Sequence, residues 1–303
     1  MRMLLLANTS KRSASWPVVS RQGTRTGTAV IVTPGGAGAS WSLWYGASVN
    51  KKQGARQGKR ASGRLPGLTR DEGYTVHPFD ATFGVRTSGL VAGRYLKSGH
   101  RNDRHATAYY GVAPSVFRAL VKRWLRLGPC GALEECAFVD VGAGMGRAVL
   151  LAAEMPFRAV VGVELNPTLA RMARRNCAVW RALGRAQTEM EIRCGDATAM
   201  RLPKGPCLAF LFNPFGGPVM RRMLEHLAQR FADKPGELDL LYVNNEQEGE
   251  LEKKRGFRRL FVGQVARSAA DARADHAILA NQPDGEYASS NYEDCSIWRW
   301  VGH

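Results

Sequence analysis

The stretch that decides the fold of this chain is Phe138-Val139-Asp140-Val141-Gly142-Ala143-Gly144-Met145-Gly146. An apolar run ends there in three glycines at alternate positions, and a helical pattern begins at about Arg147. Glycines at such a junction let the backbone turn sharply and let a ligand lie directly against main-chain N–H groups. The stretch therefore predicts the first strand, turn and helix of a nucleotide-binding α/β sheet.

The next apolar run, 160–163, ends at Glu164, which comes 20 residues after Gly144. At this point the second strand of a nucleotide-binding βαβ unit offers a carboxylate to ribose hydroxyls. A dinucleotide fingerprint would also require glycine at position 147, where this chain has arginine. The glycine spacing therefore favours a ligand other than a dinucleotide.

Strands and helices alternate through the rest of the chain. Strands are expected at 137–141, 159–163, 191–194, 207–212 and 238–243, and helices at 114–127, 147–155, 167–183, 218–231 and 246–255. The runs 259–265 and 296–301 are expected to pair at the end of the sheet, and the polar segment 268–293 to be an insertion with a short strand at 276–280. The predicted fold is α/β, a Rossmann-like, doubly wound, seven-stranded mixed sheet with an antiparallel C-terminal strand pair.

The charge of the chain is concentrated at its N-terminus. Residues 1–70 contain 12 Lys and Arg and no Asp or Glu, whereas the other 233 residues hold 31 basic and 26 acidic side chains. This polar composition predicts a disordered basic tail over 1–72, followed by a helical cap segment, 73–128, and the main domain, 129–303. Three interpretations of the tail stay open: a basic arm for nucleic acid or an acidic surface, an organelle transit peptide, and a reading frame whose true start lies near residue 70.

Composition argues against membrane and metal-binding classes of protein. No apolar stretch approaches the roughly 20 residues that a membrane-spanning helix needs. The six cysteines have neither a Cys-x-x-Cys spacing nor histidine partners at zinc spacing. We expect a soluble, cytoplasmic protein with reduced cysteines, no metal and no membrane partner, and the sequence leaves its oligomeric state open.

Polar residues also follow the third and fourth predicted strands. Gly195-Asp196-Ala197 comes after 191–194, and Asn213-Pro214-Phe215-Gly216 comes after 207–212. Asp196 alone is consistent with a turn former, and Glu164 alone with a carboxylate at a helix start. Because the carboxyl ends of parallel strands meet at one edge of a sheet, their order along the chain favours a single binding site there.

Together these motifs resemble the class I methyltransferases, which use S-adenosyl-L-methionine (SAM) on a seven-stranded sheet. The order of Tyr110-Gly111, 138–142, 161–164, Gly195-Asp196 and 212–215 is similar to that of the non-SET histone-lysine methyltransferases of the Dot-one type and their bacterial relatives. The resemblance covers about residues 105–245. That family has Asn-Asn-Phe where this chain has Asn-Pro-Phe, which in turn resembles the Asn-Pro-Pro-Tyr/Phe motif of amino methyltransferases.

The resemblance implies SAM as the cofactor and a role for each matching residue. Asp140 would orient the ammonium group of SAM, Glu164 would accept from both ribose hydroxyls, and Asp196 would hold the adenine amino group. The remaining cofactor contacts that the resemblance implies are Tyr110, Gly111, Gly142, Ala143, Gly144, Gly146 and Ala197.

Methyl transfer is an in-line displacement at carbon, so the main task of the site is to align the nucleophile with the sulfonium. We predict Asn213, Pro214 and Phe215 as the catalytic residues. The Asn213 side-chain oxygen and a main-chain carbonyl near Pro214 can accept the N–H groups of an amine, and Phe215 can supply an apolar wall. A lysine acceptor, with an ordinary pKa of about 10.4, must first lose a proton, and His100 and His105 are candidate bases.

The predicted function is a SAM-dependent methyltransferase that acts on an amine, with protein lysine preferred over nucleic acid. The first alternative is an RNA, DNA or small-molecule acceptor, for which the basic tail and the arginine-rich face of the 114–127 helix would follow phosphates. The second is a SAM-binding protein without catalysis. The motif at 79–89, Phe-Asp-Ala-Thr-Phe-Gly-Val-Arg-Thr-Ser-Gly, is compatible with a lid over the cofactor or with packing.

Overall fold

The computed structural model describes residue 65, residue 68 and residues 74–281 and 290–302 of the chain. The basic tail predicted for 1–72 lies outside the described residues, apart from Leu65 and Leu68. The three interpretations of the tail therefore stay predictions.

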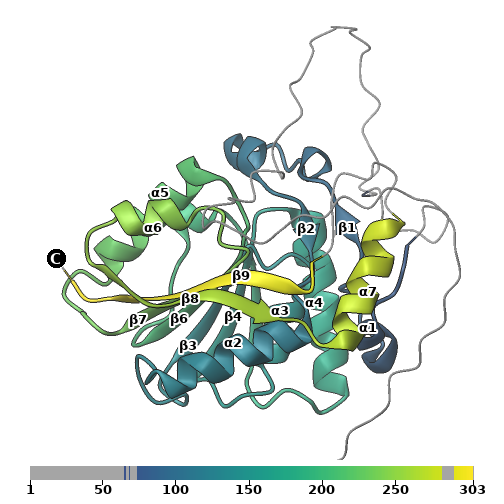
Figure 1. Ribbon diagram of the computed structural model, residues 1–303, viewed down its shortest axis with the longest axis horizontal. Helices are drawn as coiled ribbons and strands as arrows, with labels where there is room; N and C mark the ends of the chain where they lie inside the picture. Colours follow the sequence, from purple (N-terminus) through teal and green to yellow (C-terminus); the bar gives the residue numbers. More distant parts are fainter. Residues whose placement is uncertain (1–64, 66–67, 69–73, 282–289, 303) are drawn as a thin grey trace, which may run out of the picture. The chain divides into compact units, whose positions relative to one another are not determined.

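A seven-stranded sheet forms the centre of the described chain (Figure 1). Its strands are β3 (Ala137–Val141), β4 (Ala159–Glu164), β5 (Met190–Cys194), β6 (Cys207–Phe212), β7 (Leu238–Val243), β8 (Phe257–Ala266) and β9 (Tyr292–Trp300). They lie in the order β5-β4-β3-β6-β7-β9-β8; the first five of that order are parallel, and β9 is antiparallel to both β7 and β8. This confirms the predicted mixed sheet with its antiparallel C-terminal pair.

Six α-helices accompany this sheet within the described residues: α2 (Pro114–Arg126), α3 (Arg147–Ala152), α4 (Pro167–Ala182), α5 (Gly217–Arg230), α6 (Glu248–Lys253) and α7 (Ala269–Ala280). Shorter elements are α1 (Pro78–Phe83), β1 (Leu90–Val91), β2 (Tyr109–Tyr110) and the 3-10 turns η3 (Gly93–Tyr95), η4 (Arg101–His105) and η5 (Ala197–Ala199). Several helices begin as their sequence predicts. Pro167 opens α4 directly after Asn166, whose side chain accepts from two backbone N–H groups of the first turn.

The central strands are buried on both faces, which explains their continuously apolar sequences. Every residue of β3 and β7 is buried, as expected for strands covered by helices on each side. Side chains of α2, α3 and α4 pack on one face of the sheet, and those of α5 and α6 pack on the other. Figure 1 shows the same division, with α5 and α6 opposite α2 and α3. The sheet is therefore doubly wound, as predicted.

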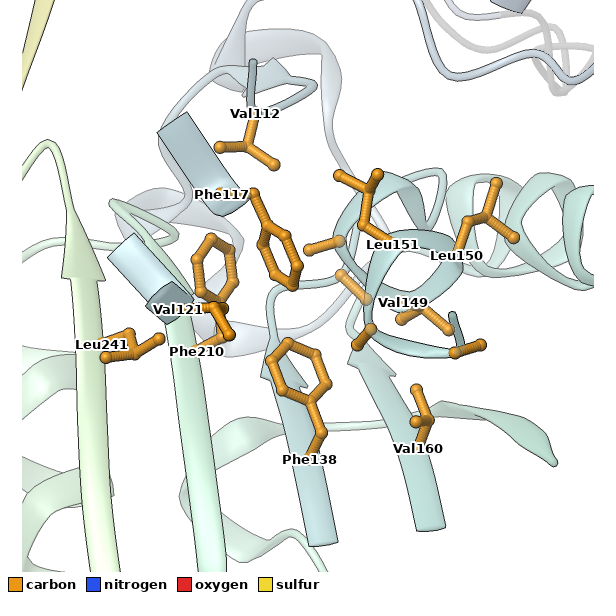
Figure 2. Packing of buried hydrophobic residues seen from close by; sticks show 14 of the residues in the cluster. Val112, Phe117, Val121, Phe138, Val149, Leu150, Leu151, Val160, Phe210 and Leu241 are labelled. Atoms are coloured by element: carbon orange, nitrogen blue, oxygen red, sulfur yellow. The ribbon is translucent and has the colours of Figure 1, made fainter. Parts of the chain in front are cut away.

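Helix α2 belongs to the same hydrophobic core as the sheet. Its Phe117 ring lies 5.9 Å from the ring of Phe138 in β3 and 5.3 Å from that of Phe210 in β6. Figure 2 shows these three rings converging, with Val121 beside them. The predicted boundary at residue 128 thus falls between two elements that share one core, and the division into cap and main domain stays a prediction.

The short strand predicted at 276–280 is wrong, because this segment is the last part of helix α7. Ser268 caps the helix by accepting from the N–H of Asp271, and the helix sequence is rich in alanine, the strongest helix former. Its buried side chains recur at helical spacing and include two aspartates, Asp271 and Asp275. The polar composition of residues 268–280 therefore reflects a helix whose buried face carries carboxylates, and the partners of these carboxylates lie far away in the sequence.

Candidate functional site

A cavity of about 960 Å³, counting the open solvent at its mouth, lies at the carboxyl ends of β3, β4 and β6. Residues 96–112, here called the covering segment, contribute the facing wall. Strands β3 and β6 are the neighbours between which the winding of the sheet reverses, the usual place for a ligand in this class of fold. Among the predicted site residues, the wall includes Tyr110, Gly111, Asp140, Gly142, Ala143, Gly144, Glu164, Asp196, Ala197, Pro214 and Phe215, but not Gly146 or Asn213.

The glycine loop passes tightly between two other parts of the chain. Gly142 and Gly144 have φ angles of 78° and 54°, in the left-handed region that favours glycine. A Cβ atom on Gly142 would overlap Pro214, and one on Gly144 would overlap the ring of Tyr109. Glycine at these positions therefore allows both the turn and the close packing of the loop against the covering segment.

Glu164 is fixed to the glycine loop by backbone hydrogen bonds. The N–H of Gly144 donates to Glu164 Oε2, and the N–H of Asn166 donates to Oε1, each over 2.7 Å. Burial raises the pKa of Glu164, and the hydrogen bonds from these backbone groups oppose that rise. Each carboxylate oxygen keeps a lone pair, so the side chain can still accept hydrogen bonds from two hydroxyls.

Asp140 is a buried carboxyl that has no hydrogen bond from a protein donor within the described part of the chain. Only 4% of the residue is exposed, and it lines the cavity. Burial, followed by the like charge of Glu164, raises its pKa well above the usual range. A cationic group bound in the cavity would relieve both effects.

Asp196 joins the far end of the cavity to the covering segment. It accepts from the N–H and hydroxyl of Thr198, over 2.9 Å and 2.7 Å, and from the side-chain amide of Asn102, over 2.9 Å. Partial burial opposes ionisation, but the hydrogen bonds from Thr198, the charge of His100 and the amide of Asn102 lower the pKa of Asp196. Asp196 is therefore an ionised acceptor at the edge of the cavity.

Tyr110 is held from behind by helix α7. Its hydroxyl donates to Asp275 Oδ1 over 2.5 Å, and Arg267 lies 3.1 Å from the other oxygen of Asp275. Burial raises the pKa of Asp275, while the Tyr110 hydroxyl and the charge of Arg267 lower it. This arrangement fixes the Tyr110 ring in the cavity wall, and the helix that does so was predicted as an irregular insertion.

The motif at 79–89 packs around the helix that follows the glycine loop. Asp80 accepts from the N–H and hydroxyl groups of Thr87 and Ser88, over 2.5 to 2.7 Å. Arg147, the first residue of α3, donates to the Thr87 hydroxyl over 2.7 Å and to the carbonyl of Gly111 over 3.1 Å. No residue of this motif lines the cavity, which favours packing over a lid.

Asn213, in the loop after β6, is not among the residues that line the cavity. Asn213 has a φ of 37° and is 7% exposed, and its Oδ1 atom is buried without a hydrogen-bond partner among the described residues. Its neighbours Phe212 and Pro214 do line the cavity. The predicted catalytic set is thus divided: Pro214 and Phe215 line the cavity, and Asn213 does not.

Main-chain groups of this loop are bound by the covering segment. The Thr107 N–H donates to the Pro214 carbonyl over 3.4 Å, and the Thr107 hydroxyl donates to the Asn213 carbonyl. The N–H of Gly216 donates to the carbonyl of His105 over 2.9 Å. The main-chain carbonyls expected to accept from an amine therefore each have one donor already, and each keeps a second lone pair.

The two candidate histidine bases do not line the cavity. The His100 ring lies 3.8 Å from Asp196 Oδ2, at the opposite end of the site from Asn213. For His105, burial and the charges of Arg104 and Arg222 lower the pKa. Neither ring is positioned by the structure to take a proton beside Asn213.

Sequence reasoning missed several residues that organise the site. Asn102 joins Asp196 to Arg222, whose guanidinium donates to Asn102 Oδ1 over 2.7 Å. No sequence pattern marks Thr107 or Asp275 as site residues, because the residues that they contact lie far away in the chain.

Within the described ranges, no group of three or more His, Cys, Asp or Glu side chains could hold a metal ion. The helices of the same residues include none with the length and apolar character to cross a membrane. All six cysteines are free.

No family model and no curated protein matches this chain. Solved structures are similar to this chain at low identity. The [4+2]-cyclase SpnF is 17% identical, with a TM-score of 0.43 over 62% of this chain and 82% of its own. Magnesium protoporphyrin IX methyltransferase from Synechocystis, with bound SAM, is 15% identical, with a TM-score of 0.41 over 62% of this chain and 79% of its own. The ribosomal protein L11 methylase from Lactobacillus delbrueckii is 12% identical, with a TM-score of 0.38 over 62% of this chain and 77% of its own. Similarity at this level assigns no activity to this chain.

Proposed function

We propose that this chain binds SAM and transfers its methyl group to an amine. One observation carries the proposal: Asp140, Glu164 and Asp196 lie at the carboxyl ends of three adjacent parallel strands and line one cavity together with the glycine loop. Three carboxylates in a row match a ligand with an ammonium group, a ribose and an adenine amine in that order.

The unpartnered carboxyl of Asp140 supports binding of an amino-acid ammonium group. Ionisation of a buried carboxyl beside a second carboxyl is unfavourable when no cation is bound nearby. An ammonium group would provide both a positive charge and N–H donors. Glu164 then accepts from the two ribose hydroxyls while the Gly144 N–H keeps its carboxylate in place. Asp196 retains one lone pair for the adenine amino group, next to Ala197.

Bound SAM supplies a methyl group on a sulfonium, and the residues of this chain contribute alignment and the exclusion of water. Tyr110, Phe212 and Phe215 line the cavity with aromatic surface, and the Tyr110 and Phe212 rings lie edge to face with centroids 6.5 Å apart. Such walls keep water from the reacting atoms and favour cation–π contact with positive charge.

An amine acceptor is supported by the unpartnered Oδ1 of Asn213, because an amine has N–H donors to offer it. Among amines we propose protein lysine. Leu96, Phe212 and Phe215 give the cavity an apolar lining that suits the methylene stem of a lysine side chain. An apolar surrounding also lowers the pKa of a lysine and so favours its neutral, nucleophilic form.

The proposal is tested by incubating the full chain with methyl-labelled SAM and a cell extract, then digesting the labelled material with protease or nuclease. If protease digestion releases the label, the acceptor is a protein, which supports lysine. If nuclease digestion releases the label, the acceptor is RNA or DNA. Label in small molecules moves it to metabolites. SAM binding without transfer to any fraction supports the non-catalytic alternative.

A further inference from the structure

Asn102 joins three separate parts of the chain beside the cavity. It lies in η4, within the covering segment, where it is 5% exposed and lines the cavity. Its side-chain nitrogen donates to Asp196 Oδ2 over 2.9 Å, and its side-chain oxygen accepts from Arg222 Nη2 of α5 over 2.7 Å. Both ends of the buried amide are therefore bound, by residues that lie 94 and 120 positions further along the chain.

The charges of these partners decide which way round the Asn102 amide lies. A guanidinium has donors and no acceptor, so the amide oxygen must face Arg222. The amide NH2 group then faces Asp196, and an ionised carboxylate can only accept. Arg222 therefore orients the Asn102 amide so that it presents a donor to Asp196.

The turn that carries Asn102 is fixed by its own hydrogen bonds. The His100 ring accepts from the N–H of Asn102 over 3.2 Å, and the carboxylate of Asp103 accepts from the backbone N–H groups of 98–100, over 2.7 to 3.1 Å. Helix α5 packs against both this turn and η5, which begins directly after Asp196. The fold around Asn102 thus holds its side chain next to Asp196 before any ligand binds.

The hydrogen bonds of Asp196 occupy its two carboxylate oxygens unequally. Oδ2 accepts from Asn102 and from the hydroxyl of Thr198, and it lies 3.8 Å from the His100 ring. Among the described residues, Oδ1 accepts from the N–H of Thr198 alone, over 2.9 Å, and so keeps a lone pair. Burial opposes ionisation of Asp196, but the hydrogen bonds from Thr198, the charge of His100 and the amide of Asn102 lower its pKa. A ligand therefore meets Asp196 as an acceptor that has no proton to donate.

Resting on the proposed function, we propose that Asn102 is a positioning residue that makes the cofactor site specific for a base with an exocyclic amino group. Its amide occupies Oδ2 of Asp196, holds the carboxylate in place and leaves Oδ1 to accept from that amino group. Arg222 acts one step further away, by keeping the donor end of the amide towards Asp196. A base without the amino group leaves the Asp196 lone pair without its donor, which weakens binding.

The test compares two ligands that differ only at this amino group. S-adenosylhomocysteine is what SAM becomes after methyl transfer, and its purine analogue has hydrogen where adenine has the amino group. Calorimetry with the full chain should show S-adenosylhomocysteine binding at least about tenfold more tightly, as expected for a hydrogen bond to a charged group. In Asn102→Ala this preference should fall at least about threefold, while the affinity for the purine analogue changes less than about twofold.

The matched control is Asn281→Ala, at the end of α7. Asn281 is exposed, its side chain donates to the hydroxyl of Thr75, and it does not line the cavity. This variant also loses one asparagine hydrogen bond, so it should keep the wild-type preference.

The outcomes separate this inference from the function on which it rests. If the wild type binds neither ligand, SAM binding itself is excluded and the role of Asn102 fails with it. If the wild type binds both ligands equally, cofactor binding stands and the inference is overturned. If Asn102→Ala keeps the wild-type preference, or weakens both ligands by the same factor, Asn102 does not set the specificity of the site.

If Asn102→Ala does not fold, Asn102→Asp decides. Aspartate fills the same space and keeps an acceptor for Arg222, but it places no NH2 donor against Asp196. A preference equal to that of the wild type overturns the inference, and a preference reduced at least about threefold supports it.

Discussion

Asp80 and Arg147 form a buried ion pair between the N-terminal motif and the first residue of α3, with 3.7 Å between Asp80 Oδ1 and Arg147 Nη2. Only 1% and 2% of the two side chains are exposed. Arg147 occupies the position where a dinucleotide fingerprint would have glycine, and its guanidinium also lies 5.7 Å from the Phe79 ring. The arginine that separates this chain from dinucleotide-binding proteins therefore anchors the 79–89 motif beside the glycine loop.

Asp80→Asn should strongly destabilise the protein, because it leaves the Arg147 charge buried without compensation. Removing one partner of a buried pair costs about 3–5 kcal/mol of unfolding free energy, measurable by urea denaturation. The matched control is Glu191→Gln, which breaks a more exposed pair with Arg193 and should cost less than about 1 kcal/mol. Equal losses in the two variants would contradict the role assigned to Asp80.

His77 should make stability dependent on pH. Burial, followed by the charge of Arg147, lowers the pKa of His77 from 6.5 to about 4. Between these values the unfolded chain binds a proton that the folded protein excludes, so stability is complete above pH 6.5 and decreases as the pH falls towards 4. His77→Asn keeps an acceptor for the N–H of Phe79 and should flatten this dependence in denaturation measured at several pH values. An unchanged slope in the variant would show that other groups cause it.

Glu164→Gln should weaken SAM binding without unfolding the protein. A glutamine oxygen can still accept from one of the two backbone N–H groups that bind the carboxylate, those of Gly144 and Asn166, but the charged acceptor for the ribose hydroxyls is lost. A hydrogen bond to a charged group contributes about 1.5–3 kcal/mol, so calorimetry should show an affinity reduced by at least about tenfold. Glu189→Gln, an exposed residue that precedes β5 at the opposite edge of the sheet, should bind SAM normally. Unchanged affinity in Glu164→Gln would exclude SAM as the ligand.

Asp140→Asn should stabilise the free protein and weaken SAM binding. Burial raises the pKa of Asp140, so the folded state retains a proton that the unfolded state has lost, and stability falls as pH rises between the two values. The amide removes this effect, with an expected gain on the order of 1 kcal/mol at neutral pH and little gain near pH 4. Thermal unfolding and SAM titration measure the two changes, with the exposed Asp233→Asn as control. A variant that is less stable at neutral pH would show that Asp140 is ionised and well compensated.

The loop at 213–216, which we predict to be catalytic, could be located from sequence but its orientation could not. Asn213 follows a continuously apolar run, which was enough to place it at the carboxyl edge of the sheet. Its side-chain direction depends on a φ of 37° and on Thr107, which binds the carbonyl of Asn213 from 106 residues away. Neither the conformation nor the partner has a local signal.

Helix α7 was missed for a related reason. Its apolar residues do not form one clear stripe, because the helix buries Asp271 and Asp275 instead. Those carboxylates are satisfied by the N–H of Ser115 and the hydroxyl of Tyr110, which lie more than 150 residues earlier. Periodicity predicts a helix only when the buried face is apolar.

The sequence by itself determined the order of strands and helices, the doubly wound sheet, and the edge at which Asp140, Glu164 and Asp196 gather. These follow from local rules, since apolar runs, glycine turns and helix caps act within a few residues and parallel strands bring their carboxyl ends to one edge. Only the tertiary structure decided which side chains meet: Asp80 with Arg147, Tyr110 with Asp275, and Asn102 with Asp196. A buried polar group needs a partner, but nothing in its own neighbourhood specifies which distant residue will provide it.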